Sequence, residues 1–276
     1  MDLTNIKDLK LALKISGHSA NKGLGQHFLV DRESLEKVIE AGDLASTDTV
    51  VEIGPGLGVL TTPLTEKVSK VLAVELDDKL AALLQNDKPE NLEVIKQDIM
   101  SLNLSELPEK YKVVANIPYY LTSAIFRLFL SSEIRPTLMS VLIQKEVAKR
   151  ITAKPGSMSI LALSVQYYGR PEYVCTVEKS KFWPEPKVDS AVLKVEVYDQ
   201  PAFEADHQKL FRLIKAGFGE KRKMLKNSLS GGLSLDATEV TQLIEDAKLP
   251  PTSRAQELSL EDWERLYRLA ANKNYI

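Results

Sequence analysis

Residues 49–58 read TVVEIGPGLG, a run of β-branched and apolar residues followed by three glycines at alternate positions. The run predicts a buried strand. Glycine allows a tight turn and lets a ligand approach the backbone where a Cβ would block it. The segment therefore predicts a strand, then a glycine-rich loop, then the start of a helix.

The alternation of short apolar runs and amphipathic stretches continues to residue 144. Strands are predicted at residues 49–53, 71–75, 92–96, 112–116 and 138–144, with helices at 57–67 and 78–85. Strands that are apolar throughout are typical of a parallel sheet covered by helices on both faces. We therefore predict an α/β fold with a Rossmann-like, doubly wound sheet.

The pattern changes after residue 156. Residues 157–168 have helical spacing, and residues 171–177 and 190–198 alternate as strands that would extend the sheet. Helices are then predicted at 206–218, 220–229, 237–249 and 260–273, with breaks at Gly231–Gly232 and Pro250–Pro251. We expect a sheet-containing domain over residues 1–200, with an N-terminal arm over 1–46, and a small all-helical domain over 201–276.

The composition excludes several classes of protein. The 276 residues carry 36 Lys and Arg against 38 Asp and Glu, so the net charge of −2 does not by itself indicate a polyanion-binding protein. The single cysteine, Cys175, cannot form an internal disulfide, and His18, His27 and His207 lack zinc-ligand spacing, so no metal is expected. Without a signal-peptide layout or an apolar run of ~18 residues, we expect a soluble, cytoplasmic monomer with no membrane partner.

Glu75 ends the second predicted strand, where a carboxylate can accept hydrogen bonds from both hydroxyls of a ribose. Dinucleotide sites need G-x-G-x-x-G, but Val59 occupies the position of the third glycine. The observed G-x-G-x-G, preceded by Glu52, instead resembles the first motif of S-adenosylmethionine-dependent methyltransferases. A turn without a ligand is the alternative. Asp98, after the third strand, either contacts the adenine of this cofactor or caps the helix that follows.

Asn116-Ile117-Pro118-Tyr119 follows the fourth predicted strand. The amino group of adenine or cytosine is a poor nucleophile because its lone pair is delocalised into the ring, and two acceptors on its hydrogens would localise that pair. The Asn116 oxygen and the Pro118 carbonyl can supply them, and we expect no helix to use this carbonyl. Tyr119 offers a flat face for an extracted base. An ordinary Asn-x-Pro turn is the alternative, but together with the glycine loop the motif predicts an amino methyltransferase.

From about residue 18 to residue 270, the chain resembles the ribosomal RNA adenine N6-dimethyltransferases of the KsgA/Dim type, which share a catalytic domain with the Erm resistance methyltransferases. The resemblance is carried by GLGQHFLVD (23–31), EIGPGLG (52–58), VELD (74–77), QDIM (97–100), NIPYYLTSAIF (116–126), QKEVAKR (144–150), FWPEPKVDSAV (182–192) and KRKMLKNSL (221–229). It implies an enzyme of small-subunit biogenesis that acts on an immature 30S-type particle. Its targets would be two adjacent adenosines in the 3′-terminal hairpin of small-subunit (16S) ribosomal RNA.

The implied reaction is a direct in-line displacement, in which the adenosine N6 attacks the sulfonium methyl of S-adenosylmethionine and S-adenosylhomocysteine leaves. By resemblance, the cofactor-binding residues are His27, Leu29, Gly54, Gly56, Glu75, Asp98 and Asn116, and the catalytic residues are Asn116, Pro118, Tyr119 and Phe182. Phe182 would stack on the flipped adenine opposite Tyr119, whereas the residues alone would assign it to the core or a hinge. Many relatives have Asn at the position of His27. A histidine contact there can respond to pH, and a partly exposed arm residue is the alternative.

Residues 204–230 contain seven bases against three acids, a local excess of four positive charges. The bases are Lys209, Arg212, Lys215, Lys221, Arg222, Lys223 and Lys226. Such a cluster is often only a solvated helix face. The resemblance makes it a phosphate-contacting surface in an RNA-positioning domain, with Lys221, Arg222, Lys223 and Lys226 as the RNA-binding residues.

Three alternatives remain at this point. An Erm-type large-subunit (23S) ribosomal RNA adenine N6-methyltransferase would use the same chemistry, although KRKMLKNSL (221–229) and SRAQELSLEDWERLYR (253–268) favour the small-subunit enzyme. The protein could also be mainly a non-catalytic ribosome assembly factor. A nicotinamide-dependent oxidoreductase is the weakest of the three, because the third glycine falls one position early.

Overall fold

The computed structural model describes residues 1–20, 25–86, 88–220 and 223–276, which form two compact units. The first unit contains Met1–Ala148 and Arg170–Asp199, and the second contains Lys149–Gly169 and Gln200–Ile276. The segment 149–169 thus belongs to the same compact unit as the C-terminal helices. A functional boundary at residue 200 stays a prediction.

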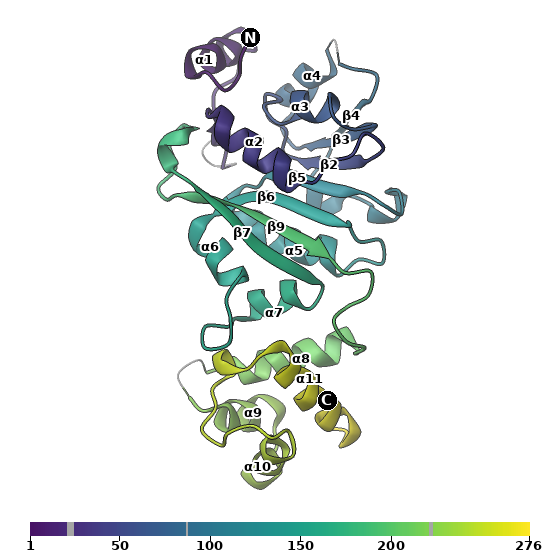
Figure 1. Ribbon diagram of the computed structural model, residues 1–276, viewed down its shortest axis with the longest axis vertical. Helices are drawn as coiled ribbons and strands as arrows, with labels where there is room; N and C mark the ends of the chain where they lie inside the picture. Colours follow the sequence, from purple (N-terminus) through teal and green to yellow (C-terminus); the bar gives the residue numbers. More distant parts are fainter. Residues whose placement is uncertain (21–24, 87, 221–222) are drawn as a thin grey trace. The chain divides into compact units, whose positions relative to one another are not determined.

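The first unit is built on a seven-stranded sheet in the order β4-β3-β2-β5-β6-β9-β7 (Figure 1). Its strands are β2 (Thr49–Ile53), β3 (Lys70–Glu75), β4 (Leu92–Lys96), β5 (Lys112–Asn116), β6 (Leu138–Gln144), β7 (Gly169–Val177) and β9 (Ser190–Val197). The first five are parallel, and β9 pairs antiparallel with β6. The predicted α/β fold is therefore confirmed, with an antiparallel extension of the parallel sheet.

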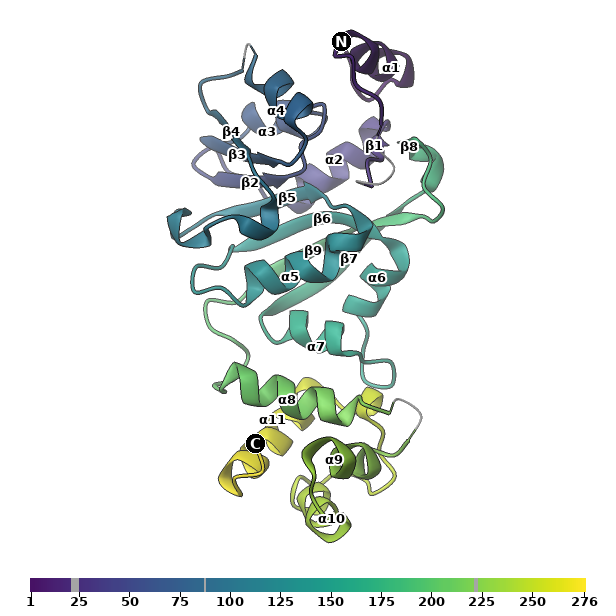
Figure 2. The ribbon, with the colours of Figure 1, turned by 180° about the vertical axis from the view of Figure 1, so that it is seen from behind.

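Helices cover both faces of this sheet. Figures 1 and 2, drawn from opposite sides, show α2 (Arg32–Ala41) on one face and α5 (Thr122–Leu130) on the other. Val38 of α2 is fully buried in the same apolar cluster as Val50 and Val114 of the central strands. Burial from both sides explains why the central strands are largely apolar.

The helix after the glycine loop is shorter than predicted. The expected helix over 57–67 is wrong at its start, because α3 covers only Thr61–Thr65. Gly54, Gly56 and Gly58 have φ of +64°, +61° and +88°, a backbone conformation that a right-handed helix cannot contain. The next helix, α4 (Asp78–Gln85), has the predicted bounds and is capped by Asp77, whose carboxylate accepts hydrogen bonds from two backbone N–H groups.

A two-stranded sheet joins the arm to the segment after β7. In it β1 (Phe28–Leu29) pairs antiparallel with β8 (Phe182–Trp183). The remaining elements of this part of the chain are α1 (Ile6–Ile15), α6 (Lys145–Ile151) and the 3-10 turns η2 (Ile99–Ser101), η3 (Leu104–Glu106), η4 (Tyr119–Leu121) and η5 (Lys179–Lys181). The pairing places the arm beside the Pro-rich loop, although 153 residues separate them in sequence, from Leu29 to Phe182.

The second unit is helical. It contains α7 (Ile160–Gln166), α8 (His207–Gly217), α9 (Leu225–Leu233), α10 (Ala237–Asp246), η6 (Ala255–Glu257) and α11 (Leu260–Asn272). Its core includes Trp263, Leu210 and Leu225, none of which is exposed to solvent. Within the described residues, no helix of either unit is long and apolar enough to cross a membrane.

The predicted break at Gly231–Gly232 is wrong, because α9 runs through both glycines to Leu233. A Cβ on Gly232 would lie 2.6 Å from the Cβ of Ala216, whereas a Cβ on Gly231 would meet nothing within 4 Å. Gly232 therefore allows α9 to pack closely against α8. The helix ends one residue later, at Ser234, which has a left-handed backbone conformation.

Candidate functional site

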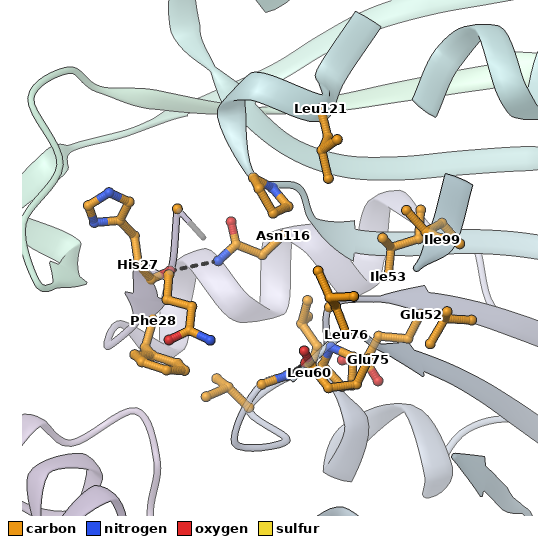
Figure 3. Close-up of a pocket in the computed structure, with 18 of the residues that line it drawn as sticks. His27, Phe28, Glu52, Ile53, Leu60, Glu75, Leu76, Ile99, Asn116 and Leu121 are labelled. Carbon is orange, nitrogen blue, oxygen red and sulfur yellow. Dashed lines mark hydrogen bonds between the residues drawn. The ribbon is translucent and has the colours of Figure 1, made fainter. Parts of the chain in front are cut away.

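A cavity opens at the carboxyl ends of the central strands, where loops after β2, β3, β4 and β5 meet the N-terminal arm (Figure 3). The strand order reverses between β2 and β5, which is where open parallel sheets bind ligands. All seven residues predicted to bind the cofactor line this cavity: His27, Leu29, Gly54, Gly56, Glu75, Asp98 and Asn116. The fold thus brings together residues from five separate segments of the chain.

The glycine loop brings bare backbone to the cavity wall. Gly54 has positive φ, and a Cβ built on it would meet no atom within 4 Å, so its conformation rather than crowding favours glycine. Gly56 differs, since a Cβ there would lie 3.0 Å from Cε1 of Phe28. The loop and the arm can approach this closely only because Gly56 has no side chain.

The Glu75 carboxylate ties the loop to the end of β3. One of its oxygens accepts a hydrogen bond from the Gly56 N–H at 2.9 Å and the other from the Asp77 N–H at 2.8 Å. Burial raises the pKa of Glu75, and these two backbone donors oppose that rise. A carboxylate has about four acceptor positions, so capacity remains for the hydroxyls of a ligand.

Glu52 is the feature of the site that sequence reasoning missed. The sequence showed only an acid before the glycines, but in the structure Glu52 is 1% exposed and lines the cavity. Neither of its carboxylate oxygens has a hydrogen-bond partner among the described residues. Burial raises the pKa of Glu52 to about 8; Glu75 adds to the rise, and the nearby Thr61 hydroxyl opposes it. An unpartnered buried acid is expected to find its partner in a ligand.

Asp98 caps the 3-10 turn η2 that follows it, which is one of the two roles that the sequence predicts for this residue. Its side chain accepts a hydrogen bond from the Met100 N–H at 2.9 Å, at the start of η2. The same residue lines the cavity, so capping and ligand binding are compatible. The cap holds the carboxylate in place at the cavity wall.

Asn116 is the last residue of β5, Pro118 follows two residues later, and both line the cavity. The Asn116 Nδ2 donates a hydrogen bond to the His27 carbonyl at 2.9 Å, the dashed line in Figure 3. The expectation that no helix uses the Pro118 carbonyl is wrong, because in η4 it accepts a hydrogen bond from the Leu121 N–H at 2.9 Å. A carbonyl oxygen has a second lone pair, which leaves one acceptor position at Pro118.

Tyr119 is fixed at both ends of its side chain. Its hydroxyl shares a hydrogen bond of 2.8 Å with the Ser190 hydroxyl, and its ring stacks with His27 at a centroid distance of 6.0 Å and an interplanar angle of 22°. Burial raises the pKa of Tyr119, so the phenol is neutral at physiological pH. The neighbouring Tyr120 lines the cavity and is 60% exposed.

Phe182 is not at the cavity surface. It lies in β8 with 3% exposure and packs with Leu29 in the main apolar cluster. This burial agrees with the core interpretation that the residues alone favoured. A stacking role for its ring stays a prediction.

The predicted RNA-binding residues belong to the second unit. Lys221 and Arg222 lie outside the described residues. Lys223 is exposed and forms an ion pair with Glu220, and Lys226 is partly exposed near the start of α9. The exposed side of α8 carries three further bases, Lys209, Arg212 and Lys215, spaced three residues apart on one helix face.

Comparison with known proteins identifies the family. The family model described as ribosomal RNA adenine dimethylase matches residues 17–272. The chain belongs to this family. Ribosomal RNA adenine dimethylases are methyltransferases, and membership implies S-adenosylmethionine as the cofactor. The predicted family, enzyme class and cofactor are thereby confirmed.

Individual relatives of the dimethylase are similar over most of their length. Ribosomal RNA small subunit methyltransferase A of Dehalococcoides mccartyi is 46% identical over 256 residues, which cover 90% of this chain and 87% of the relative. The protein of the same name from Alkaliphilus metalliredigens is 40% identical over 263 residues, or 91% and 92% of the two chains.

Two solved structures are also similar. A dimethyladenosine transferase from Plasmodium falciparum has a TM-score of 0.78 and 25% identity, over 89% of this chain and 98% of that chain. The 23S rRNA methyltransferase ErmE has a TM-score of 0.71 and 26% identity, over 87% of this chain and 98% of that chain. Both similarities extend over far more than the sheet.

The residues at the cavity of this dimethylase fit S-adenosylmethionine. The cofactor carries a sulfonium and an ammonium group, and Glu52 offers buried carboxylate oxygens without partners. The glycine loop leaves backbone accessible, and Glu75 and Asp98 retain acceptor capacity at the wall. The chemistry of the donors therefore suits a nucleoside with a cationic substituent.

Proposed function

We propose that this protein transfers methyl groups from S-adenosylmethionine to N6 of two adjacent adenosines in the 3′-terminal hairpin of 16S ribosomal RNA, giving N6,N6-dimethyladenosine. The observation that carries the chemistry is the pair of acceptors at Asn116 and Pro118 beside a cavity that fits the cofactor. The substrate is supported by relatives named as small-subunit methyltransferases, at 46% and 40% identity over about nine-tenths of the chain.

In this proposal, S-adenosylmethionine supplies an electrophilic methyl group on its sulfonium. Glu75 accepts hydrogen bonds from the ribose hydroxyls, Asp98 accepts from the adenine amino group, and the Gly54–Gly56 backbone lines the cofactor. His27 and Leu29 close over its methionine part. Glu52, protonated in the protein without cofactor, gives up its proton when the cationic cofactor binds and then compensates positive charge. Because the Glu75 carboxylate is already hydrogen-bonded to the glycine loop and to Asp77, this part of the site is ordered before the ligand enters.

The target adenosine meets acceptors rather than a base. Asn116 Oδ1 and the remaining lone pair of the Pro118 carbonyl accept the N6 hydrogens, which localises the nitrogen lone pair for in-line attack. Tyr119 holds one face of the flipped base. We keep Phe182 as the partner on the other face, a role that requires its ring to leave the core position that it has here.

RNA binding is assigned to the basic segment of the second unit. Lys221, Arg222, Lys223 and Lys226 are proposed to contact phosphates, together with the exposed bases of α8. We further propose that the protein acts as a monomer on an immature 30S-type particle in the cytoplasm, as an RNA-processing enzyme of ribosome biogenesis.

The main rival is an Erm-type enzyme of the large subunit, since ErmE shares the architecture. Its identity to this chain is 26%, against 46% for the small-subunit relative from Dehalococcoides mccartyi. A mainly non-catalytic assembly factor is the other rival. In that case subunit maturation would not depend on the acceptors of the site.

The deciding experiment adds the protein and S-adenosylmethionine to undermethylated 30S subunits and maps N6,N6-dimethyladenosine by mass spectrometry. We expect two adjacent dimethylated adenosines in the 3′-terminal hairpin with the wild type and almost none with Asn116→Ala. Methylation of 23S RNA instead would favour the Erm-type rival. If both proteins restore subunit maturation equally, the assembly role is independent of catalysis.

A further inference from the structure

His27 of the arm contacts two other segments of the chain, the end of β5 with the turn after it and the loop after β8. Its backbone carbonyl accepts from Asn116 Nδ2 at 2.9 Å, its ring Nδ1 lies 2.6 Å from the Pro184 carbonyl, and its ring stacks with Tyr119. We propose that His27 is a positioning residue that orients the Asn116 amide for methyl transfer. This inference rests on the proposed function and assigns His27 a role apart from contact with the cofactor.

The orientation of the Asn116 amide follows from the chemistry of its partner. A backbone carbonyl can only accept a hydrogen bond, so the amide atom that faces His27 must be the NH₂ group. The amide is planar, and its oxygen therefore points away from His27 and is available as an acceptor. If the amide turned over, Asn116 would present N–H donors to an amino group that also needs to donate, and no hydrogen bond could form.

The direction of the His27 carbonyl is set by strand geometry. Along a strand, backbone polar groups point alternately to one side and the other. The Val30 N–H donates to the Lys181 carbonyl at 2.8 Å, so Val30 faces the strand that contains β8. In the register Phe28 to Trp183, Phe28 faces the same way and His27 faces the opposite way. The pairing of β1 with β8 thus directs the His27 carbonyl toward Asn116.

The His27 ring adds a contact that the backbone does not make. Pro184 follows β8 and lies opposite His27 in this register, at a position where an antiparallel pair forms no backbone hydrogen bond. Its carbonyl accepts from His27 Nδ1 instead, which requires the proton to be on Nδ1. Stacking on Tyr119, whose hydroxyl is bonded to Ser190, restrains the ring from a second direction. Both contacts hold the backbone of His27, and therefore its carbonyl, in place.

The test is a double-mutant cycle between His27 and Asn116, measured as the single-turnover rate of methyl transfer to 30S subunits. His27→Phe keeps an aromatic ring and removes the donor to Pro184. We expect it to lower the rate about tenfold in the wild type but less than about twofold in Asn116→Ala, because the two residues act through one group. Any change in the dissociation constant for S-adenosylmethionine should be the same factor in the wild type and in Asn116→Ala. His27→Asn, which restores a donor, should recover part of the rate.

His18→Phe is the matched control, because His18 belongs to the same arm and has its own side-chain hydrogen bond, to Gln26. Any loss of rate caused by His18→Phe should be the same factor in the wild type and in Asn116→Ala. If His27 had only a structural effect, His27→Phe would also lower the rate by the same factor in both proteins. If His27→Phe lowers the rate by equal factors in both backgrounds, while the wild type methylates 30S subunits, the positioning role is refuted and the proposed function stands.

A second measurement does not depend on the RNA substrate. The side-chain amide signals of Asn116 can be assigned in a ¹⁵N-correlated NMR spectrum by their loss in Asn116→Ala. The proposal predicts that they shift in His27→Phe and not in His18→Phe. If the Asn116 amide signals of His27→Phe are unchanged, the positioning role of His27 is overturned, whether or not small-subunit RNA proves to be the substrate.

Discussion

Asn116 combines a fixed amide nitrogen with an available oxygen next to the Pro118 carbonyl. The side chain is only partly buried and is no part of the apolar core, so its removal should cost function rather than stability. For Asn116→Ala we expect a loss of at least about 100-fold in methyl transfer, the order of effect of removing one positioned polar group at a reaction centre. Cofactor affinity, measured by calorimetry, should change little. Full dimethylation by this variant would contradict the proposed role.

Glu52 makes a pH-dependent contribution to stability. The folded protein keeps the proton of this carboxyl up to about pH 8, whereas the usual pKa is 4.5. The stability that comes from the neutral group is therefore complete below pH 4.5 and is lost as the pH rises toward 8. Glu52→Gln removes this loss, so without cofactor the difference in melting temperature between variant and wild type should grow from pH 5 to pH 8. A difference that is constant over this range would show that folding does not raise the pKa of Glu52.

Some of the site residues could be predicted from the sequence, and others could not. The glycines, Glu75 and Asn116 could be assigned because strand ends in a parallel sheet meet at one edge. The hydrogen bond from Leu121 to the Pro118 carbonyl depends on how η4 folds. The burial of Phe182 decides between core and hinge, the two places that the residues alone allowed. Contacts between distant segments, such as His27 with Pro184, leave no periodic pattern and could not be predicted.

At the scale of elements, the strands were predictable and the helix ends near glycines were not. Strands β2, β5 and β6 have the predicted bounds because their largely apolar runs are buried on both faces. The edge strand β4 also has the predicted bounds, although Glu93 and Lys96 are exposed. Gly231–Gly232 resembled a break because glycine disfavours helices, but close packing of α9 on α8 outweighs that preference. Tertiary contact, rather than local propensity, sets the length of α9.

This packing gives a matched pair of substitutions. Gly232→Ala should lower the free energy of unfolding by about 1–3 kcal/mol, because the new methyl group would overlap Ala216 of α8. Gly231→Ala, one residue earlier and with nothing within 4 Å, should be neutral or stabilising by up to about 1 kcal/mol. Chemical denaturation of both variants measures the difference. Equal stabilities would show that α8 and α9 are not in close contact.

At the scale of the whole molecule, charge is unevenly distributed. The net charge of −2 conceals an excess of four positive charges over residues 204–230. Phosphate contacts release counterions, so such a segment can bind RNA although the protein as a whole is slightly acidic. The sequence could locate this segment but not the geometry of its phosphate contacts, and Lys221 and Arg222 lie outside the described residues.

Simultaneous replacement of Lys221, Arg222 and Lys223 by Gln should weaken binding to 30S subunits and flatten its salt dependence. Each lost phosphate contact lowers the slope of log K against log salt concentration by about 0.7–0.9. The control replaces Lys37, Lys67 and Lys70 of the first unit by Gln, which makes the same change in net charge. Titrations at several salt concentrations compare the two, and an unchanged slope in the first variant would argue against phosphate contacts there.

The division of the chain into units has a consequence for how the protein folds. The second unit is discontinuous: the Gly156 and Met158 N–H groups donate to the Gln256 carbonyl, and the Ala202 N–H donates to the Tyr167 carbonyl. Residues 149–169 therefore leave the ribosome long before the helices that complete their hydrogen bonds. Contacts of such wide sequence separation form slowly. During synthesis, the Gly156 and Met158 N–H groups ahead of α7 must therefore wait for their acceptor until Gln256, close to the end of the chain, has been made.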